Sequence, residues 1–236
     1  MQTETGLIKI IQQDENGERA ARVSCPGCGT PHPGRYFLAY HPGEIQVPLG
    51  QPLFPVGMQA GLDDGQEPLL GPVPKSWNPG DRLQVRGPIG RGFELPATIR
   101  RLALAAFGVT AARLLPLIPA AIQSGADIAL FTHQAISPSS LPAAVEIHSL
   151  SAIGESLSWA GFLAIDIPLE GLPHLRKTLG LDPHERVPCQ AEALVWTPMP
   201  CGATADCGAC SVPSQKGNFR LACKDGPVFN LQELDW

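Results

Sequence analysis

Four of the seven cysteines lie close together in the last part of the chain, and this cluster limits the possible folds more than any other feature. They are Cys201, Cys207, Cys210 and Cys223, in the spacing C-x5-C-x2-C-x12-C. In a reducing compartment, clustered thiols are more often metal ligands than disulfides. The segment therefore predicts a loop that wraps around a metal centre.

Three interpretations of the thiols compete. Structural zinc sites usually use two C-x2-C pairs, whereas this segment has one, Cys207 and Cys210. A [2Fe–2S] cluster takes three thiolates from a C-x4-C-x2-C loop and a fourth from farther along the chain. The chain has that form with one extra residue in the first gap. We therefore predict a [2Fe–2S] cluster on all four cysteines, with a zinc site or unrelated free thiols as the alternatives.

The residues between the cysteines support a wrapped loop. Gly202 and Gly208 each follow a cysteine, and glycine permits the backbone conformations that such a loop needs. The run SVPSQKGNFRLA (211–222) predicts a hairpin, which returns Cys223 to the loop. Two carboxylates, Asp206 and Asp225, flank the cysteines. Their charge would lower a cluster potential, although Asp225 before a glycine is also ordinary turn chemistry.

Composition narrows the class of protein. The chain has 236 residues, of which 44% are hydrophobic and 17% charged, with a net charge of −5. These values indicate a globular protein without the basic surface that nucleic acid or an anionic membrane requires. The 25 glycines and 25 prolines favour short elements and many turns.

One apolar stretch, residues 102–122, raises the question of a membrane span. Arg113 lies in its middle, and Pro116 and Pro119 follow closely. A buried strand followed by a proline-containing helix fits this pattern better than a transmembrane helix. The amino-terminal MQTETGLIKI shows no signal peptide. We therefore expect a cytoplasmic protein.

The periodicity of the chain changes near residue 98. Residues 1–97 alternate in short apolar runs between turn signals and predict an antiparallel β-barrel. Residues 98–188 alternate strands with helices and predict a small parallel α/β domain, and residues 189–236 form a cysteine-rich tail. The expected barrel strands are 7–12, 21–25, 35–40, 44–49 and 82–87. The expected later strands are 99–107, 126–133, 143–150, 162–169 and 191–196, with helices over 109–125 and 172–181.

The tail resembles the electron-transfer subunit of dihydroorotate dehydrogenase, in the motifs M-P-C-G, C-G-A-C and C-K-D-G-P-V-F (199–202, 207–210 and 223–229). The resemblance extends to residues 32–40 and to N-P-G-D-R-L-Q-V-R-G-P-I-G-R-G-F (78–93). It implies a ferredoxin-reductase-like assembly of an FAD-binding barrel, an NAD-binding α/β domain and a [2Fe–2S] tail. In that family, electrons pass between FAD, the cluster and the FMN of a separate catalytic subunit.

The chain departs from the family at the flavin. The family strand R-P-[IFL]-S-[IVL] supplies an arginine to the FAD phosphate. Its counterpart here is Phe54-Pro55-Val56-Gly57-Met58, in which phenylalanine and glycine replace arginine and serine. Loss of the cation removes a charge-assisted bond of about 1.5–3 kcal/mol. The first four residues are therefore candidates for a weakened FAD site, and FAD stays an open possibility.

The chain also departs at the nicotinamide. The family turn G-G-G-x-G-x-A-P is represented by Ala105 to Ala112, in which only Gly108 remains and Phe107 occupies a glycine position. Glycines at such turns let the backbone approach a pyrophosphate. The family C-G-P motif is replaced by Asp166-Ile167-Pro168, whose carboxylate would repel the same group. We therefore do not expect NAD to bind.

A second cysteine pair, Cys25 and Cys28, spans C-P-G-C. It resembles one half of a zinc ribbon, with His32 and Cys189 as spare ligands, but two thiols in a tight barrel loop are the simpler interpretation. The six histidines show no ligand spacing. They are read as surface or hydrogen-bonded residues (His32, His41, His133, His148, His174 and His184). No catalytic constellation is visible, so no catalytic residue is assigned.

The sequence thus predicts a non-catalytic electron-transfer component of an oxidoreductase complex. The resemblance implies that its partner is an FMN-containing dihydroorotate dehydrogenase subunit of pyrimidine biosynthesis. The aromatic ending, Phe229 to Trp236, suits either that interface or a cap on the α/β domain. Two alternatives stay open, an autonomous NAD(P)H-dependent flavin reductase and a zinc-stabilised binding module.

Overall fold

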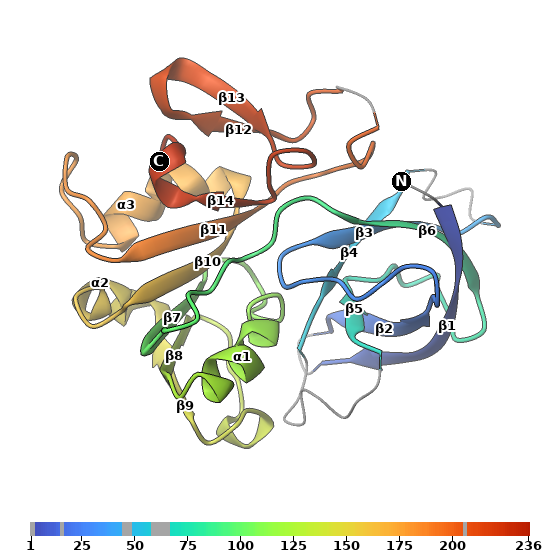
Figure 1. Cartoon of the computed structure of the whole chain (residues 1–236), viewed down its shortest axis with the longest axis horizontal. Helices are drawn as coiled ribbons and strands as arrows, with labels where there is room; N and C mark the ends of the chain where they lie inside the picture. Colours follow the sequence, from blue (N-terminus) through green and yellow to red (C-terminus); the bar gives the residue numbers. More distant parts are fainter. Residues whose placement is uncertain (1–2, 15–16, 44–48, 58–66, 205–206) are drawn as a thin grey trace.

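The computed structural model describes residues 3–14, 17–43, 49–57, 67–204 and 207–236. It shows a β-barrel beside an open α/β sheet, with the cysteine segment above their junction (Figure 1). The barrel is antiparallel and closes in the order β1-β2-β5-β4-β3-β6. Its strands are β1 (Thr3–Gln13), β2 (Arg19–Ser24), β3 (Tyr36–Tyr40), β4 (Gln51–Pro55), β5 (Leu69–Gly71) and β6 (Arg82–Ile89).

Alternation along the strands fills the barrel. In β6, Leu83 and Val85 are buried while their neighbours are more exposed, as expected where one face of a strand lines a core. The inward side chains form a separate apolar core that includes Phe37 and Trp77. The short strands β4 and β5 were not predicted as strands, because each is only three to five residues long and bordered by glycine or proline. The expected strand at 44–49 lies mostly outside the described residues.

The second part is a six-stranded sheet in the order β14-β11-β10-β7-β8-β9. Five strands are parallel, and β14 joins the edge antiparallel to β11. The central strands are continuous apolar runs because both faces of a parallel sheet are covered. The strands are β7 (Arg101–Ala106), β8 (Asp127–Thr132), β9 (Val145–Ser149), β10 (Phe162–Pro168), β11 (Gln190–Trp196) and β14 (Val228–Asn230). The predicted fold class is confirmed.

The helices are shorter than the sequence predicted. The segment 109–125 begins with turns, and its two prolines each lie in the first turn of a short helix, where a missing amide costs nothing. The α-helices are α1 (Ile118–Gln123), α2 (Ile153–Ser156) and α3 (Leu175–Thr178). The 3-10 helices are η1 (Leu115–Leu117), η2 (Pro138–Ser140), η3 (Leu150–Ala152), η4 (Leu169–His174), η5 (Gln215–Gly217) and η6 (Leu231–Glu233). Within the described ranges, none is long and apolar enough to cross a membrane.

One hydrophobic core joins the barrel to the sheet. Outward-facing barrel side chains, including Tyr36, Leu38 and Phe54, pack in the same core as the sheet strands. Part of the tail belongs to this core as well, since Phe229 of β14 is fully buried. Trp236 lies against Arg176, whose guanidinium carbon is 4.1 Å from the ring centroid. The aromatic ending therefore closes the α/β sheet, which was one of its two predicted roles.

Candidate metal centre

The cysteine segment is a loop and a hairpin inserted between β11 and β14. The hairpin consists of β12 (Ser211–Ser214) and β13 (Asn218–Leu221), as the sequence predicted. Its turn uses left-handed backbone at Lys216 and Gly217, with φ values of 65° and 70°. Directly beyond the paired strands, the Ala222 amide donates to the Cys210 carbonyl oxygen at 2.9 Å. The hairpin thereby returns Cys223 to the side of Cys210.

The four predicted ligand cysteines lie in two pairs. The Sγ atoms of Cys210 and Cys223 are 3.2 Å apart, and both residues are buried. The Sγ atoms of Cys201 and Cys207 are 3.6 Å apart, with Cys201 half-buried and Cys207 exposed. One pair therefore faces the protein interior and the other faces solvent.

These separations suit two thiolates on one metal ion. Two sulfur ligands on a tetrahedral ion, each with a bond of about 2.3 Å, lie about 3.8 Å apart. Across the described part of the chain, no three Cys, His, Asp or Glu side chains converge as ligands of a single ion. The arrangement thus offers two ligands to each of two metals, which is the ligand set of a [2Fe–2S] cluster. A mononuclear zinc site needs four ligands on one ion and fits less well.

The loop is seated directly on the barrel wall. Gly202 has a φ of 50°, and a Cβ at this position would lie 2.5 Å from Cδ2 of Leu38 on β3. Arg86 of β6 donates a hydrogen bond from its guanidinium to the Gly202 carbonyl oxygen. Only glycine combines this backbone conformation with so close a contact. The barrel therefore positions the segment at its first cysteine.

Tyr36 of β3 lies next to the buried pair, Cys210 and Cys223. Its hydroxyl lies 3.5 Å from the Cys223 carbonyl oxygen, at the long limit of a hydrogen bond. Burial, followed by the nearby cysteines, raises the pKa of Tyr36 far above its usual value, so the phenol stays protonated and acts as a donor. Burial and the adjacent Cys210 raise the pKa of Cys223 to about 12. Loading a metal here must therefore release protons from the thiols.

Two carboxylates, Asp206 and Asp225, flank the cysteines in the sequence, and the structure describes only the second. Asp206 lies outside the described residues. The carboxylate of Asp225 accepts a hydrogen bond from the Leu221 amide at 2.8 Å, and the Asp225 amide donates to the Leu221 carbonyl oxygen at 2.7 Å. Asp225 therefore closes the turn around Cys223, which agrees with the simpler interpretation of this residue.

The candidate flavin residues lie at the end of β4. Phe54 is fully buried, and its ring centroid is 5.6 Å from that of Tyr36 and 5.6 Å from that of Trp196. It offers no polar atom to a phosphate. Pro55 is the last residue of β4 and Val56 follows it, and the Gly57 amide donates to the Ala112 carbonyl oxygen at 2.9 Å. Met58 lies outside the described residues. The phosphate-binding cation of the family is thus replaced by an aromatic contact.

The carboxyl ends of β7 and β10 form the place where an open α/β sheet binds a dinucleotide, because the strand order reverses there. Arg113 spans this place. Its Nε and Nη2 atoms donate to the two carboxylate oxygens of Asp166 at 2.9 and 3.0 Å. The guanidinium carbon also lies 4.8 Å from the centroid of the Trp196 ring. The chain's own side chains therefore occupy the nicotinamide end of the sheet.

This ion pair changes the expected role of Asp166. Arg113 is 7% exposed and Asp166 is 0% exposed, so the carboxylate faces its counter-ion rather than a ligand. Burial raises the pKa of Asp166, and Arg113 opposes that shift. Sequence reasoning noted Arg113 only as an argument against a membrane span. A single cation inside an apolar run was also a signal that a buried carboxylate must lie near it.

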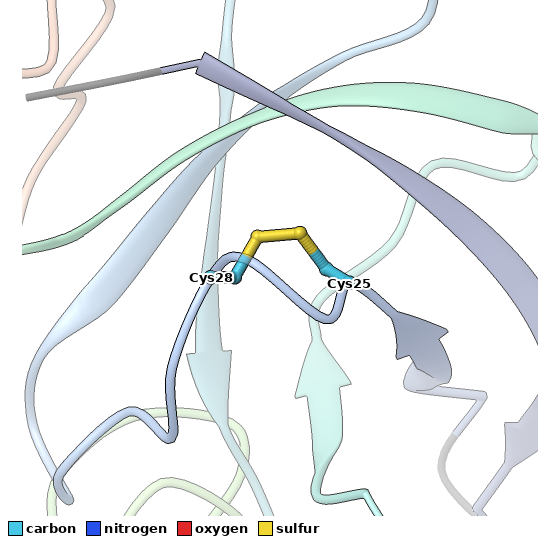
Figure 2. Close-up of a disulfide and its surroundings, with 2 residues drawn as sticks. All are labelled: Cys25 and Cys28. Carbon is cyan, nitrogen blue, oxygen red and sulfur yellow. A yellow bond between two sulfur atoms is a disulfide. The ribbon is translucent and has the colours of Figure 1, made fainter.

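The second cysteine pair differs from its prediction. The structure joins Cys25 and Cys28 by a disulfide at the end of β2, with Cα atoms 5.4 Å apart (Figure 2). The expectation of two free thiols is therefore wrong. The tight turn, in which the Cys28 amide donates to the Cys25 carbonyl oxygen at 2.9 Å, brings the two sulfurs together. His32 is exposed and Cys189 belongs to the tail before β11, so neither spare ligand completes a metal site.

The histidines agree with their prediction as surface or hydrogen-bonded residues. Five of them are exposed, and His41 is half-buried beside Asp81 at 3.3 Å. His148 stacks on Phe131, with ring centroids 5.2 Å apart.

Known proteins show two levels of similarity to the chain. Residues 197–235 match the family model of the iron-sulfur cluster binding domain of dihydroorotate dehydrogenase B. The chain is 25% identical over 169 residues to the electron transfer subunit of dihydroorotate dehydrogenase B (NAD(+)) of Clostridium perfringens. That alignment covers 66% of this chain and 68% of the relative. The matched domain contains all four clustered cysteines.

Solved structures agree on the fold. An NADH-dependent reduced ferredoxin-NADP oxidoreductase superposes with a TM-score of 0.70 at 17% identity, over 100% of this chain and 91% of that one. Phthalate dioxygenase reductase superposes with a TM-score of 0.51 at 11% identity, over 98% of this chain and 77% of that one. The chain is thus similar to the dihydroorotate dehydrogenase B electron-transfer subunit, its tail matches an iron–sulfur cluster binding domain, and its fold is ferredoxin-reductase-like.

Proposed function

We propose that this chain is an electron-transfer subunit that carries one [2Fe–2S] cluster on Cys201, Cys207, Cys210 and Cys223. The two close sulfur pairs are the observation that carries the proposal, because they provide two ligands for each iron. When bound, the cluster supplies reversible one-electron transfer. The protein holds the ligands, excludes water from the Cys210 and Cys223 side, and leaves the Cys207 side open.

The same geometry defines how a partner approaches. Electron transfer between proteins requires cofactors that come close together, and Cys207 is the most exposed of the four ligands. The neighbouring hairpin also presents Phe219, whose side chain is 69% exposed. Aromatic side chains are enriched at protein interfaces. We place the partner on this side of the cysteine segment.

The partner in this proposal is an FMN-containing catalytic subunit of dihydroorotate dehydrogenase in pyrimidine biosynthesis. It is supported by the name of the matched domain and by that of the Clostridium perfringens relative. The chain itself is then a non-catalytic component of an oxidoreductase complex. A cytoplasmic location belongs to the same proposal.

The test has two parts. Anaerobic purification followed by iron, sulfide, zinc and flavin analysis should give about two irons and two sulfides per chain. The chain should then co-elute with a co-expressed dihydroorotate dehydrogenase subunit, and addition of dihydroorotate should bleach the cluster absorbance. Stoichiometric zinc without sulfide would overturn the cluster. Separate elution, together with a cluster that stays oxidised, would overturn the partner.

A further inference from the structure

The disulfide between Cys25 and Cys28 has no role in the electron-transfer proposal, and its surroundings are those of a reaction site. It opens onto a cavity of about 490 Å³ at the mouth of the barrel. Its wall is of mixed polarity, and the apolar part includes Val23, Phe37, Leu70 and Val85. Its volume lies within the range of small-molecule sites.

The two sulfurs differ in access. Cys25 is half-buried, whereas Cys28 is 6% exposed and belongs to the barrel core. Both residues line the cavity. An incoming thiolate therefore reaches Cys25 more readily, and Cys28 is placed as the leaving and resolving thiol. This asymmetry is what thiol–disulfide exchange at a C-x-x-C motif needs.

A purely structural role explains the disulfide less well. The stabilisation that a disulfide gives the folded state grows with the length of the loop it closes, and this one spans a sequence separation of only 3. The backbone turn at Cys28 is already held by its own hydrogen bond. In the reducing compartment expected from the sequence, disulfides are usually transient and take part in catalysis or redox sensing.

The charge around the pair indicates which thiols it accepts. Glu67 lines the cavity. The carboxyl of Glu4 lies directly beside the loop, so that a Cβ on Gly27 would be 2.8 Å from Glu4 Oε2. An anionic thiol such as glutathione meets two carboxylates, whereas an uncharged thiol meets no such repulsion.

We propose that Cys25 and Cys28 form a redox-active thiol–disulfide exchange site whose substrate is an uncharged dithiol. One thiolate of the dithiol attacks Cys25 Sγ, the bond to Cys28 breaks, and Cys28 leaves as a thiolate that takes up a proton. The second substrate thiol, after losing its proton, attacks the substrate sulfur of the mixed disulfide and releases Cys25. Two electrons pass from the dithiol to the cysteine pair, and the substrate leaves as a cyclic disulfide.

The site is separate from the cysteine segment, so the two proposals fail independently. Phe37 and Val85 face the cavity, whereas their neighbours Leu38 and Arg86 face the opposite side and contact Gly202. Alternate residues of a strand point to opposite faces of the sheet. Reduction of Cys25 and Cys28 should therefore leave the iron and sulfide content unchanged.

The first experiment equilibrates the folded protein with mixtures of reduced and oxidised dithiothreitol, followed by maleimide labelling and peptide mass spectrometry. We expect the labelling of Cys25 and Cys28 to rise and fall together, reversibly, as the mixture changes. A pair that is reduced only after denaturation would overturn the proposal. A pair that does not reoxidise in the folded protein would overturn it as well.

The second experiment compares Cys28→Ser, which leaves the accessible Cys25, with its matched control Cys25→Ser, which leaves the buried Cys28. With the neutral reagent 4,4′-dithiodipyridine, the Cys28→Ser protein should react on the order of tenfold faster than the control. The anionic reagent 5,5′-dithiobis(2-nitrobenzoate) should react more slowly than the neutral one with Cys28→Ser. Equal rates for the two variants would contradict the assigned order of attack. Should both variants fail to fold, the wild-type titration alone decides.

Discussion

The cysteine segment and the carboxyl edge of the sheet belong to one fold, but they differ in how many cofactor-binding groups they contain. In the segment all four thiols remain, and the hairpin brings them into two close pairs. At the sheet edge, Phe54 of the barrel and Arg113 both pack against Trp196, in the region where the family resemblance implies flavin and nicotinamide. A cofactor site persists only while its few donor atoms persist. A fold persists as long as its buried volume is filled.

The difference has an energetic basis. A metal centre depends on ligand atoms, and no apolar residue replaces a thiolate. A dinucleotide site depends mostly on the shape of its crevice. When the ligand no longer binds, side chains that fill the crevice can stabilise the fold in its place. The buried pair of Arg113 and Asp166 is such a filling, because both charges are satisfied by each other.

The sharpest test of the comparison removes one thiol from each pair. Cys207→Ser and Cys210→Ser should each lose the cluster, since a ligand is missing from one iron and no spare thiol is part of the segment. Iron and sulfide analysis with electron paramagnetic resonance of the reduced protein measures the loss. The control is Cys189→Ser, which should keep full iron content. Full cluster content in both ligand variants would remove the distinction between the two regions.

The next largest effect should come from the sheet edge. Arg113→Leu leaves the Asp166 carboxylate buried without a counter-ion and should lower the free energy of unfolding by about 3–5 kcal/mol at neutral pH. Arg220→Leu is the control, because Arg220 pairs with Glu233 at 3.4 Å on the surface and such pairs are worth about 0–1 kcal/mol. Denaturant unfolding of both variants checks the prediction. Equal losses would show that the ion pair does not hold the edge together.

The Arg113→Leu defect should also depend on pH. Burial already raises the pKa of Asp166, and loss of the cation raises it further above its unfolded value. When a carboxyl has a higher pKa in the folded protein than in the unfolded chain, the folded protein becomes less stable as the pH rises toward the folded pKa. The deficit of the variant should therefore shrink as the pH falls toward about 4, where the unfolded carboxyl titrates. A deficit that is constant with pH would contradict this account.

A smaller effect is expected on the outer side of the cysteine segment. If the partner docks there, Phe219→Ala should weaken the complex by about 1–2 kcal/mol, roughly tenfold in dissociation constant, with the cluster intact. Val109→Ala is the control, because Val109 is 79% exposed but follows β7 in the α/β sheet. Surface plasmon resonance against the catalytic subunit distinguishes the two. A larger loss of affinity for Val109→Ala would indicate that the partner binds at the sheet edge instead.

The smallest expected effect concerns the binding of NADH, which we expect to be very weak. The isolated protein should bind NADH with a dissociation constant weaker than about 1 mM, which corresponds to a binding free energy of about −4.1 kcal/mol. Phe107→Gly should not restore binding, because Arg113 still spans the crevice to Asp166. Calorimetric titration of both proteins measures this. Tight binding by either protein would mean that the sheet edge has kept a cofactor site.

The sequence predicted much of the fold because its apolar runs and turn signals are local. The barrel, the parallel strands and the hairpin before Cys223 were all visible in this way. The pairing of Arg113 with Asp166 was not, since it joins residues 53 positions apart through a tertiary contact. The disulfide was missed because an expected reducing compartment outweighed a favourable C-x-x-C spacing. The assignment of the four cysteines as ligands stays a prediction, and their division into an inner and an outer pair depends on burial, which spacing does not encode.

The antiparallel strand β14 has a consequence for how the protein is made. The whole cysteine segment lies between β11 and β14 in the sequence, so the ribosome completes every cluster ligand before it reaches the strand that covers β11. Until then, β11 is an open sheet edge, which is a place where chains associate wrongly. The edge of β11 is therefore closed only after all four ligand cysteines have been made, when β14 pairs with it.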